Sequence, residues 1–122
     1  MVKEMNILIT SVGIRNKIVQ YFMEEIGDKG KVITTDTSEN APAIYESDKY
    51  YLVPRIDEEG YLDEILDICK KEEINAILSL IDPELLLLSE NRELFERNGV
   101  KVLVSDYELI QLATNKFNMN DH

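Results

Sequence analysis

The feature that most constrains the fold is a short stretch near the start of the chain, residues 5–16. Residues 5–10 form a continuous apolar run rich in Ile and Leu, which is typical of a strand covered on both faces, as in parallel sheets. Gly13 then allows a tight turn, and apolar residues from Ile14 onward recur three or four positions apart, as on one face of a helix. A buried strand, a turn and a helix predict the opening unit of a parallel α/β sheet, whose central strand ends where ligands bind.

The rest of the chain repeats this alternation of strand and helix. Runs of apolar and β-branched residues predict strands, and segments with a helical period predict helices. The expected strands span residues 5–10, 31–36, 49–53, 75–81 and 100–105, and the expected helices span residues 15–26, 59–73, 82–98 and 106–117, with one helical turn at 43–46. Short links and right-handed crossovers favour a three-layer α/β/α domain with a five-stranded parallel sheet in the order 3-2-1-4-5. We expect one domain over residues 1–117 and a polar tail over residues 118–122.

The net charge of the chain is −11, which argues against nucleic acid as a partner because phosphate binding needs clustered Lys and Arg. No apolar run approaches the roughly 20 residues that cross a bilayer, and the first residues lack the pattern of a signal peptide. The single cysteine, Cys69, cannot form an internal disulfide and falls on the apolar face of a predicted helix. We therefore expect a cytoplasmic protein that does not bind a membrane, and the sequence leaves a homodimer open.

Candidate substrate-binding residues follow strands 1, 2 and 4, whose carboxyl ends share one edge of such a sheet. They are Ser11, Gly13, Arg15, Asp36, Asp82 and Glu84. Each also has a structural interpretation: Gly13 makes a turn, Arg15 is a solvated residue of the first helical turn, and Asp36 caps a turn. The Asp-Pro-Glu segment at 82–84 has the features of a helix start, with an N-cap aspartate. In the functional interpretation, Arg15 lies over an anionic acceptor or a phosphate, and the carboxylate of Asp82 or Glu84 holds the amino group of an acceptor.

Three nucleotide- or phosphate-binding classes fit the residues poorly. A dinucleotide site needs G-x-G-x-x-G, whereas Gly13 is the one glycine of this loop. Asp36 does lie where an acid would hold a ribose diol, so a small NAD(H)-binding regulatory domain stays an alternative. A phosphoacceptor receiver domain needs an acid pair after the first strand, where Thr10 and Ser11 stand. A flavodoxin-type site needs aromatic stacking loops, whereas the tyrosines at 50–51 fall within a strand. A non-catalytic interaction module, using an exposed strand or helix face, is the other alternative.

Four segments in order carry a resemblance to a known family: T-S-V-G-I-R after strand 1, T-T-D-T-S at the end of strand 2, A-P-A-I-Y-E-S-D-K-Y-Y-L-V-P, and I-L-S-L-I-D-P-E-L around strand 4. Together they resemble the N-terminal domain of ATP-grasp ligases of the carbamoyl-phosphate-synthase large-subunit group, over residues 6–117. The resemblance implies a Rossmann-like, pre-ATP-grasp domain that forms one wall of a cleft and contacts the acceptor substrate. It also implies that ATP activates a carboxylate as an acyl phosphate, which an amine then attacks, so that the substrate is a small carboxylate or amine.

The resemblance further implies that a larger ATP-grasp domain, in the same chain or in a separate one, handles ATP and Mg²⁺. The sequence departs from the family pattern at Asn115-Lys116, where Asp-Lys is common, and it ends six residues later without a glycine-rich flap or an evident set of oxygen ligands for Mg²⁺. We therefore assign no catalytic or metal-binding residue. We expect this fragment alone to bind no ATP or Mg²⁺ and to be inactive, and we expect it to belong to a longer carbon–nitrogen ligase.

Overall fold

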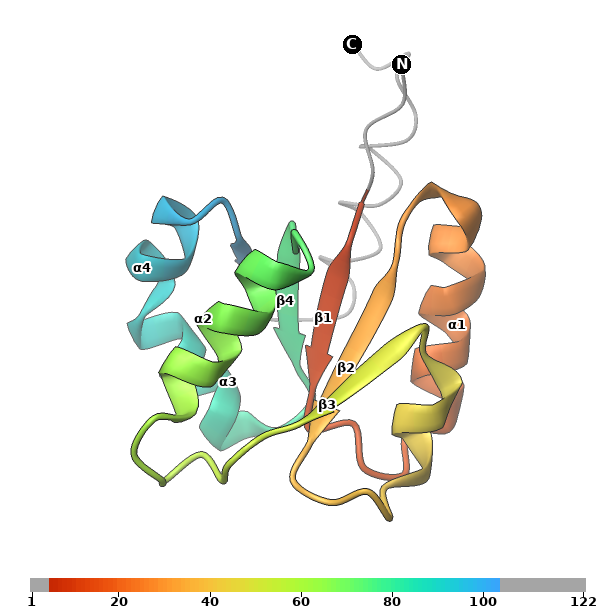
Figure 1. Ribbon diagram of the computed structural model, residues 1–122, viewed down its shortest axis with the longest axis horizontal. Coiled ribbons are helices and arrows are strands. Elements are labelled where there is room, and N and C mark those ends of the chain that lie inside the picture. The colour runs from red at the N-terminus through yellow and green to blue at the C-terminus, as the bar shows by residue number, and fades with distance from the viewer. Residues whose placement is uncertain (1–4, 104–122) are drawn as a thin grey trace, which may run out of the picture.

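The computed structural model describes residues 5–103, in which strands and helices alternate along the chain (Figure 1). The strands are β1 (Ile7–Thr10), β2 (Val32–Asp36), β3 (Lys49–Leu52), β4 (Ala76–Ser79) and β5 (Lys101–Leu103). The α-helices within these residues are α1 (Asn16–Ile26), α2 (Tyr61–Lys71), α3 (Asp82–Glu90) and α4 (Arg92–Arg97), and the 3₁₀ helices are η1 (Gly27–Lys29) and η2 (Pro42–Glu46).

The five described strands run parallel in one sheet, in the order β3-β2-β1-β4-β5. The predicted strand order is therefore confirmed. β1 lies in the middle and pairs with both β2 and β4, so that Thr10 is level with Thr35 on one side and with Ser79 on the other. The chain adds β2 and β3 on one side of β1 and then β4 and β5 on the other side. The carboxyl end of β1 is therefore the topological switch point, at which open α/β sheets bind ligands.

The sheet separates two hydrophobic cores, because successive residues of a strand face opposite sides. Ile7 and Ile9 of β1 face the core that contains Phe22 of α1, and η2 packs against this helix. Leu8 faces the other core, to which Ile65 of α2 and residues of α3 and α4 contribute. Figure 1 shows α1 on one side of the sheet and α2, α3 and α4 on the other. The predicted three-layer architecture is confirmed.

The prediction of one helix over residues 82–98 is wrong, because the chain forms two helices, α3 and α4, that are separated at Asn91. The side-chain amide of Asn91 donates to the carbonyl of Leu87 at 2.9 Å, and its backbone has φ −111° and ψ 21°. Asparagine favours helix ends because its side chain forms such local bonds. The expectation that Asp82 caps α3 is also wrong. Ile81, with extended backbone angles, is the N-cap residue, and Asp82 is already inside the helix without a capping bond from its side chain.

The helical turn expected at 43–46 is the 3₁₀ helix η2, which has a proline at its start. The amide of Ala43 donates to the carbonyl of Gly13 at 3.1 Å, so η2 is joined to the loop that follows β1. Cys69 of α2 is buried as expected, and burial raises the pKa of its thiol to about 12.

Two predicted segments, the helix over residues 106–117 and the tail over residues 118–122, lie outside the described residues. None of the helices within residues 5–103 has the length and apolar character required to span a bilayer.

Candidate functional site

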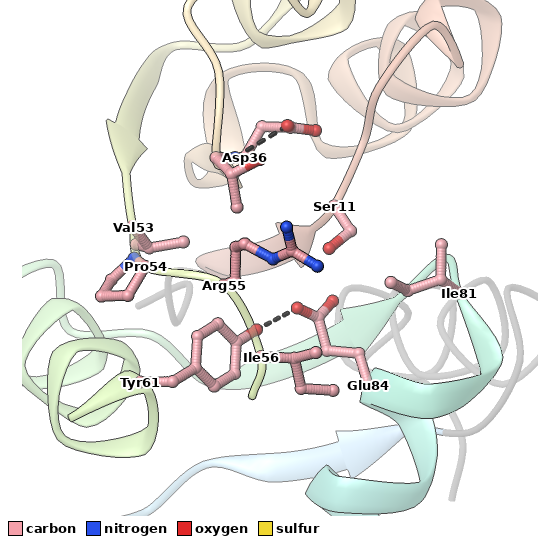
Figure 2. A pocket seen from close by; sticks show the side chains of 10 residues that line it. Ser11, Asp36, Val53, Pro54, Arg55, Ile56, Tyr61, Ile81 and Glu84 are labelled. Carbon is pink, nitrogen blue, oxygen red and sulfur yellow. Dashed lines mark hydrogen bonds between the residues drawn. The ribbon is translucent and has the colours of Figure 1, made fainter. Parts of the chain in front are cut away.

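A pocket of about 330 Å³ opens at the carboxyl edge of the sheet, between the loops that follow β1 to β4 (Figure 2). Its lining comes from segments that are far apart in the sequence: Ser11, Asp36, Thr37, Val53, Pro54, Arg55, Ile56, Tyr61, Ile81 and Glu84. Aliphatic side chains and a tyrosine ring form most of the walls, and a few charged or hydroxyl groups lie among them. Apolar walls with a small number of placed polar groups are typical of a site for a small molecule.

The carboxylate of Glu84 is anchored in this pocket by three hydroxyl groups. Glu84 is the third residue of α3 and is only 3% exposed. Its Oε1 accepts hydrogen bonds from the hydroxyls of Thr10 and, at 2.7 Å, of Ser79. Its Oε2 accepts a hydrogen bond from the hydroxyl of Tyr61 (Figure 2). Because a buried carboxylate is costly unless hydrogen bonds replace its water, these three donors are what permit Glu84 to lie here.

The parallel sheet explains why these hydroxyls meet. Thr10 and Ser79 are level in neighbouring strands, and both point to the sheet face covered by α2 and α3. Tyr61 is the first residue of α2 and reaches the same carboxylate from above this face. Burial, and then the negative charge of Glu84, raise the pKa of Tyr61 well above its usual range, so its hydroxyl keeps its proton as a donor at any physiological pH.

Thr35 continues the row of hydroxyls on the other side of Thr10. It is fully buried, and its Oγ1 is the one buried side-chain polar atom of the described residues that has no hydrogen-bond partner. An unpaired buried hydroxyl costs about 1–3 kcal/mol. The carboxyl end of the sheet therefore carries one buried hydroxyl group that the hydrogen bonds of the described residues do not use.

Asp36 organises the loops on the opposite wall of the pocket. Its Oδ2 accepts a hydrogen bond from the amide of Gly13 at 2.8 Å, and its Oδ1 accepts from the amides of Thr37 at 2.7 Å and Ser38 at 3.3 Å. Gly13 and Ser11 both have positive φ angles, of 52° and 55°, in the loop that Asp36 ties down. In a dinucleotide site the acid holds ribose hydroxyls and the loop amides face the pyrophosphate. Here the amide of Gly13, which in such a site would face the pyrophosphate, donates to the acid instead.

Arg55 is the one cation among the described residues that line the pocket, and the sequence analysis did not single it out. Figure 2 shows its guanidinium extending across the pocket toward Ser11. Its Nε lies 3.7 Å from a carboxylate oxygen of Asp57, but both side chains are at least 70% exposed, so this pair contributes little stability. The sequence position of Arg55, directly after Pro54, could have indicated this role, because the loop after β3 opens on the same carboxyl edge of the sheet as the loops after β1, β2 and β4.

The pocket lining includes three of the six residues proposed from the sequence: Ser11, Asp36 and Glu84. Gly13 lies beside the pocket as a backbone donor to the acid described above. Arg15 and Asp82 are exposed and do not line the pocket. Arg15 is instead the N-cap residue of α1.

Within residues 5–103, no group of three or more His, Cys, Asp or Glu side chains is placed to hold a metal ion. The two carboxylates of the pocket, Asp36 and Glu84, already accept hydrogen bonds from amides and hydroxyls. Since Mg²⁺ demands near-octahedral oxygen ligands, the described residues do not fit a Mg²⁺ site.

The fold and the site together define a class of domain, a Rossmann-like α/β domain with a mixed polar and apolar pocket at the switch point of its sheet. The chain belongs to the family of PylC-like N-terminal domains, and the model of this family matches residues 7–103. Membership of this family supports the coarser part of the resemblance seen in the sequence, an N-terminal domain of an ATP-grasp ligase, and does not single out carbamoyl-phosphate synthase. Among curated proteins, none is significantly similar in sequence.

Several solved structures contain a similar fold. One is glycinamide-RNase-transformylase T from Mycobacterium tuberculosis, with a TM-score of 0.58 and 12% identity over 80% of this chain and 28% of that protein. Another is N5-carboxyaminoimidazole synthetase from Staphylococcus aureus complexed with ADP, with a TM-score of 0.53 and 21% identity over 92% of this chain and 26% of that one. A third is dTDP-glucose 4,6-dehydratase from Bacillus anthracis in complex with NAD, with a TM-score of 0.51 and 18% identity over 80% of this chain and 36% of that one. Identities this low show the fold alone, and the chain spans only about a quarter to a third of these proteins.

Proposed function

We propose that this chain is the N-terminal, substrate-side domain of an ATP-dependent carboxylate–amine ligase of the ATP-grasp type, and that its pocket binds the acceptor substrate. The observation that carries the proposal is the pocket at the switch point, which combines a buried, anchored carboxylate with an exposed guanidinium. Membership of the PylC-like N-terminal domain family supports it. The finer relation to the large subunit of carbamoyl-phosphate synthase is part of this proposal and rests on the four sequence segments alone.

In this proposal Arg55 binds an anionic group of the acceptor. A guanidinium can bind a carboxylate through two parallel hydrogen bonds, which fixes its orientation as well as its position. Ser11, toward which the guanidinium extends, offers a hydroxyl on the same side of the pocket (Figure 2). The role that the sequence suggested for Arg15 therefore passes to Arg55, because Arg15 does not line the pocket.

Of the two carboxylates that the sequence offered for holding an amino group of the acceptor, Glu84 takes this role, because it lines the pocket and Asp82 does not. A carboxylate has about four acceptor positions, and the three hydroxyl bonds leave one of them open. Tyr61, Thr10 and Ser79 are positioning residues in this proposal, since their hydroxyls hold the carboxylate in place. Asp36 and Gly13 shape the opposite wall through their mutual hydrogen bond.

ATP and Mg²⁺ belong, in this proposal, to an ATP-grasp domain in the same or a separate chain. ATP would supply the phosphoryl group that activates a carboxylate, and the residues of this domain would bind and orient the acceptor against it. The Staphylococcus aureus synthetase of similar fold was solved with ADP, which supports nucleotide use by the longer protein.

The test is steady-state kinetics of the ligase that contains this domain, measured as ADP formation with a panel of small amines and carboxylates. We expect Arg55→Gln to raise the KM for the acceptor by about ten- to a hundredfold, the value of a charge-assisted hydrogen bond, and to leave the KM for ATP unchanged. Glu84→Gln should act in the same direction if the variant is folded, as checked by circular dichroism.

Arg15→Gln is the matched control, because it removes an exposed arginine from the same domain without touching the pocket. Its KM values should equal those of the unaltered protein. The proposal is refuted if Arg55→Gln leaves the acceptor KM unchanged, or if it raises the KM for ATP as much as the KM for the acceptor.

A further inference from the structure

A second cavity, of about 440 Å³, lies between the edge strand β3 and helix α2 and shares no residue with the pocket described above. It is lined by Tyr51, Glu64, Asp67, Ile68, Lys70 and Lys71. Tyr51 comes from β3, and the other five residues come from α2. The cavity is therefore a groove with a strand as one wall and a helix as the other.

The strand wall of this groove has an unpaired edge. β3 is the last strand of the described sheet on this side and pairs only with β2. In a parallel pair, only alternate residues of a strand bond to the neighbour, so the remaining amides and carbonyls of β3 point outward. An edge of this kind can accept one more strand from another chain. β3 has four residues, begins with Lys49 and is closely followed by Pro54, which restricts it to a short partner segment.

The groove has opposite charges at its two ends. At the end where β3 begins, Lys31 and Lys49 share one carboxylate, that of Glu72, at 3.0 and 3.2 Å. The ammonium groups of Lys49 and Lys71 lie 5.2 and 5.5 Å from the centre of the Tyr51 ring. Lys31 and Lys49 thus share a single carboxylate, and Lys71 lies against the same tyrosine ring, so lysines gather at this end of the groove in a chain whose net charge is −11.

The other end of the groove is acidic. Glu64 and Asp67 precede Lys71 on α2 by seven and four residues, which places all three on one face of the helix. Since α2 returns antiparallel to the strands, Glu64 lies toward the end of β3 and Lys71 toward its beginning. A segment bound along the groove would therefore meet lysines at one end and a carboxylate at the other, with Tyr51 and Ile68 between them.

We propose that the groove between β3 and α2 binds an extended peptide segment as a sixth strand, antiparallel to β3. The acidic end of the segment lies against Lys49 and Lys71, its basic end lies against Glu64, and a side chain between them packs on Tyr51 and Ile68. Antiparallel pairing is chosen because it is slightly more stable per residue than parallel pairing. This binding site is separate from the acceptor pocket and does not depend on the function proposed above.

The test uses nuclear magnetic resonance titration of the 122-residue chain with short synthetic peptides. The probe is acetyl-Lys-Thr-Val-Thr-Glu amide, and the first control is acetyl-Gln-Thr-Val-Thr-Gln amide, which has the same backbone without charges. A second control replaces the central Val by Pro, which removes an amide donor. We expect the charged probe to bind with a Kd of about 1 mM, to shift the amides of residues 49–52 and 64–71, and to bind more tightly than both controls. A nitroxide label on the amino terminus of the probe should broaden the signals of Leu52 and Glu64 more than that of Lys49.

The double variant Glu64→Lys with Lys71→Glu exchanges one charge between the two ends of the groove and keeps the net charge. It should weaken binding of the charged probe by about three- to tenfold, the value of two exposed ion pairs, whereas Glu93→Lys with Arg97→Glu on α4 should leave it unchanged. Equal binding of the charged and uncharged peptides, equal binding by the two double variants, or broadening strongest at Lys49 would each overturn the proposal. It would also be overturned if light scattering showed that the chain alone forms a dimer in which the amides of residues 49–52 are protected from exchange.

Discussion

Glu72 joins the end of α2 to the starts of β2 and β3, and replacing it with glutamine should remove a pH-dependent part of the stability. Its carboxylate is almost fully buried and accepts hydrogen bonds from Lys31 at 3.0 Å and from the hydroxyl of Tyr51, with Lys49 at 3.2 Å. The hydroxyl of Tyr51, and then the two ammonium groups, lower the pKa of Glu72 from about 4.5 to about 2, against the opposing effect of burial. The folded state therefore favours the ionised carboxylate.

A group whose pKa is lower in the folded state binds fewer protons there, so its stabilising effect is fully present above the unfolded pKa. For Glu72 this effect is complete above a pH of about 4.5 and is lost as the pH falls to about 2. At about 1.4 kcal/mol per pKa unit, the shift would be worth about 3 kcal/mol without screening. Because the side chains of Lys31 and Lys49 are 43% and 57% exposed, we expect about 2 kcal/mol.

The assay is urea denaturation of the unaltered protein and of Glu72→Gln at several pH values between 7 and 2. The difference in the free energy of unfolding between them should be largest at neutral pH and should shrink by about 2 kcal/mol between pH 5 and pH 2. Glu73→Gln, at the exposed neighbouring position, is the control and should show no such trend. A difference that stays constant over this range would refute the assigned electrostatic role of Glu72.

Three further substitutions and one labelling reaction test other parts of the structure. Thr35→Val should raise the free energy of unfolding, measured by urea denaturation, by about 1 kcal/mol, because it removes an unpaired buried hydroxyl. In the same assay Thr10→Val should lower the free energy of unfolding by about 1–3 kcal/mol, because it takes a hydrogen-bond donor from the buried carboxylate of Glu84. Gly30→Ala should unfold the domain or lower its melting temperature sharply, since an added Cβ would lie 2.0 Å from the carbonyl oxygen of Met5, and a melting temperature equal to that of the unaltered protein would contradict this contact. The thiol of Cys69 is buried and its pKa is raised to about 12, so it should react with iodoacetamide at pH 8 only as fast as the protein unfolds. Labelling is followed by mass spectrometry, and rapid labelling of the folded protein would show that the thiol is not buried.

The sheet and part of the site could be predicted because the topology follows from a one-dimensional pattern. Alternating strands and helices with short links leave few arrangements once crossovers are right-handed, and this was enough to place Ser11, Asp36 and Glu84 on one edge. Arg55 was missed because the loop after β3 has no helical or strand period, and its position after Pro54 indicates only the edge of the sheet on which it opens. Its place in the pocket depends on the path of that loop back to α2, which only the folded chain shows.

The boundaries and caps of the elements also needed the structure. An aspartate before a proline is a favourable N-cap residue, yet Ile81 is the N-cap of α3. The backbone is still extended at Ile81 and is already helical at Asp82. Local preferences of this size, about 1 kcal/mol, are easily outweighed by tertiary packing.

The sequence by itself determined the alternation of strands and helices, the two-sided burial of the central strand and the edge at which a ligand site belongs, since these depend on hydrophobic period and chirality. Only the tertiary structure decided what each polar residue does there. The carboxylate of Asp36 accepts hydrogen bonds from loop amides and so holds the loop that follows β1, whereas the carboxylate of Glu84 is held by hydroxyls from β1, β4 and α2. The reason is physical: a hydrogen bond is set by positions within about 3 Å, and residues 74 positions apart reach such distances only when the whole sheet has formed.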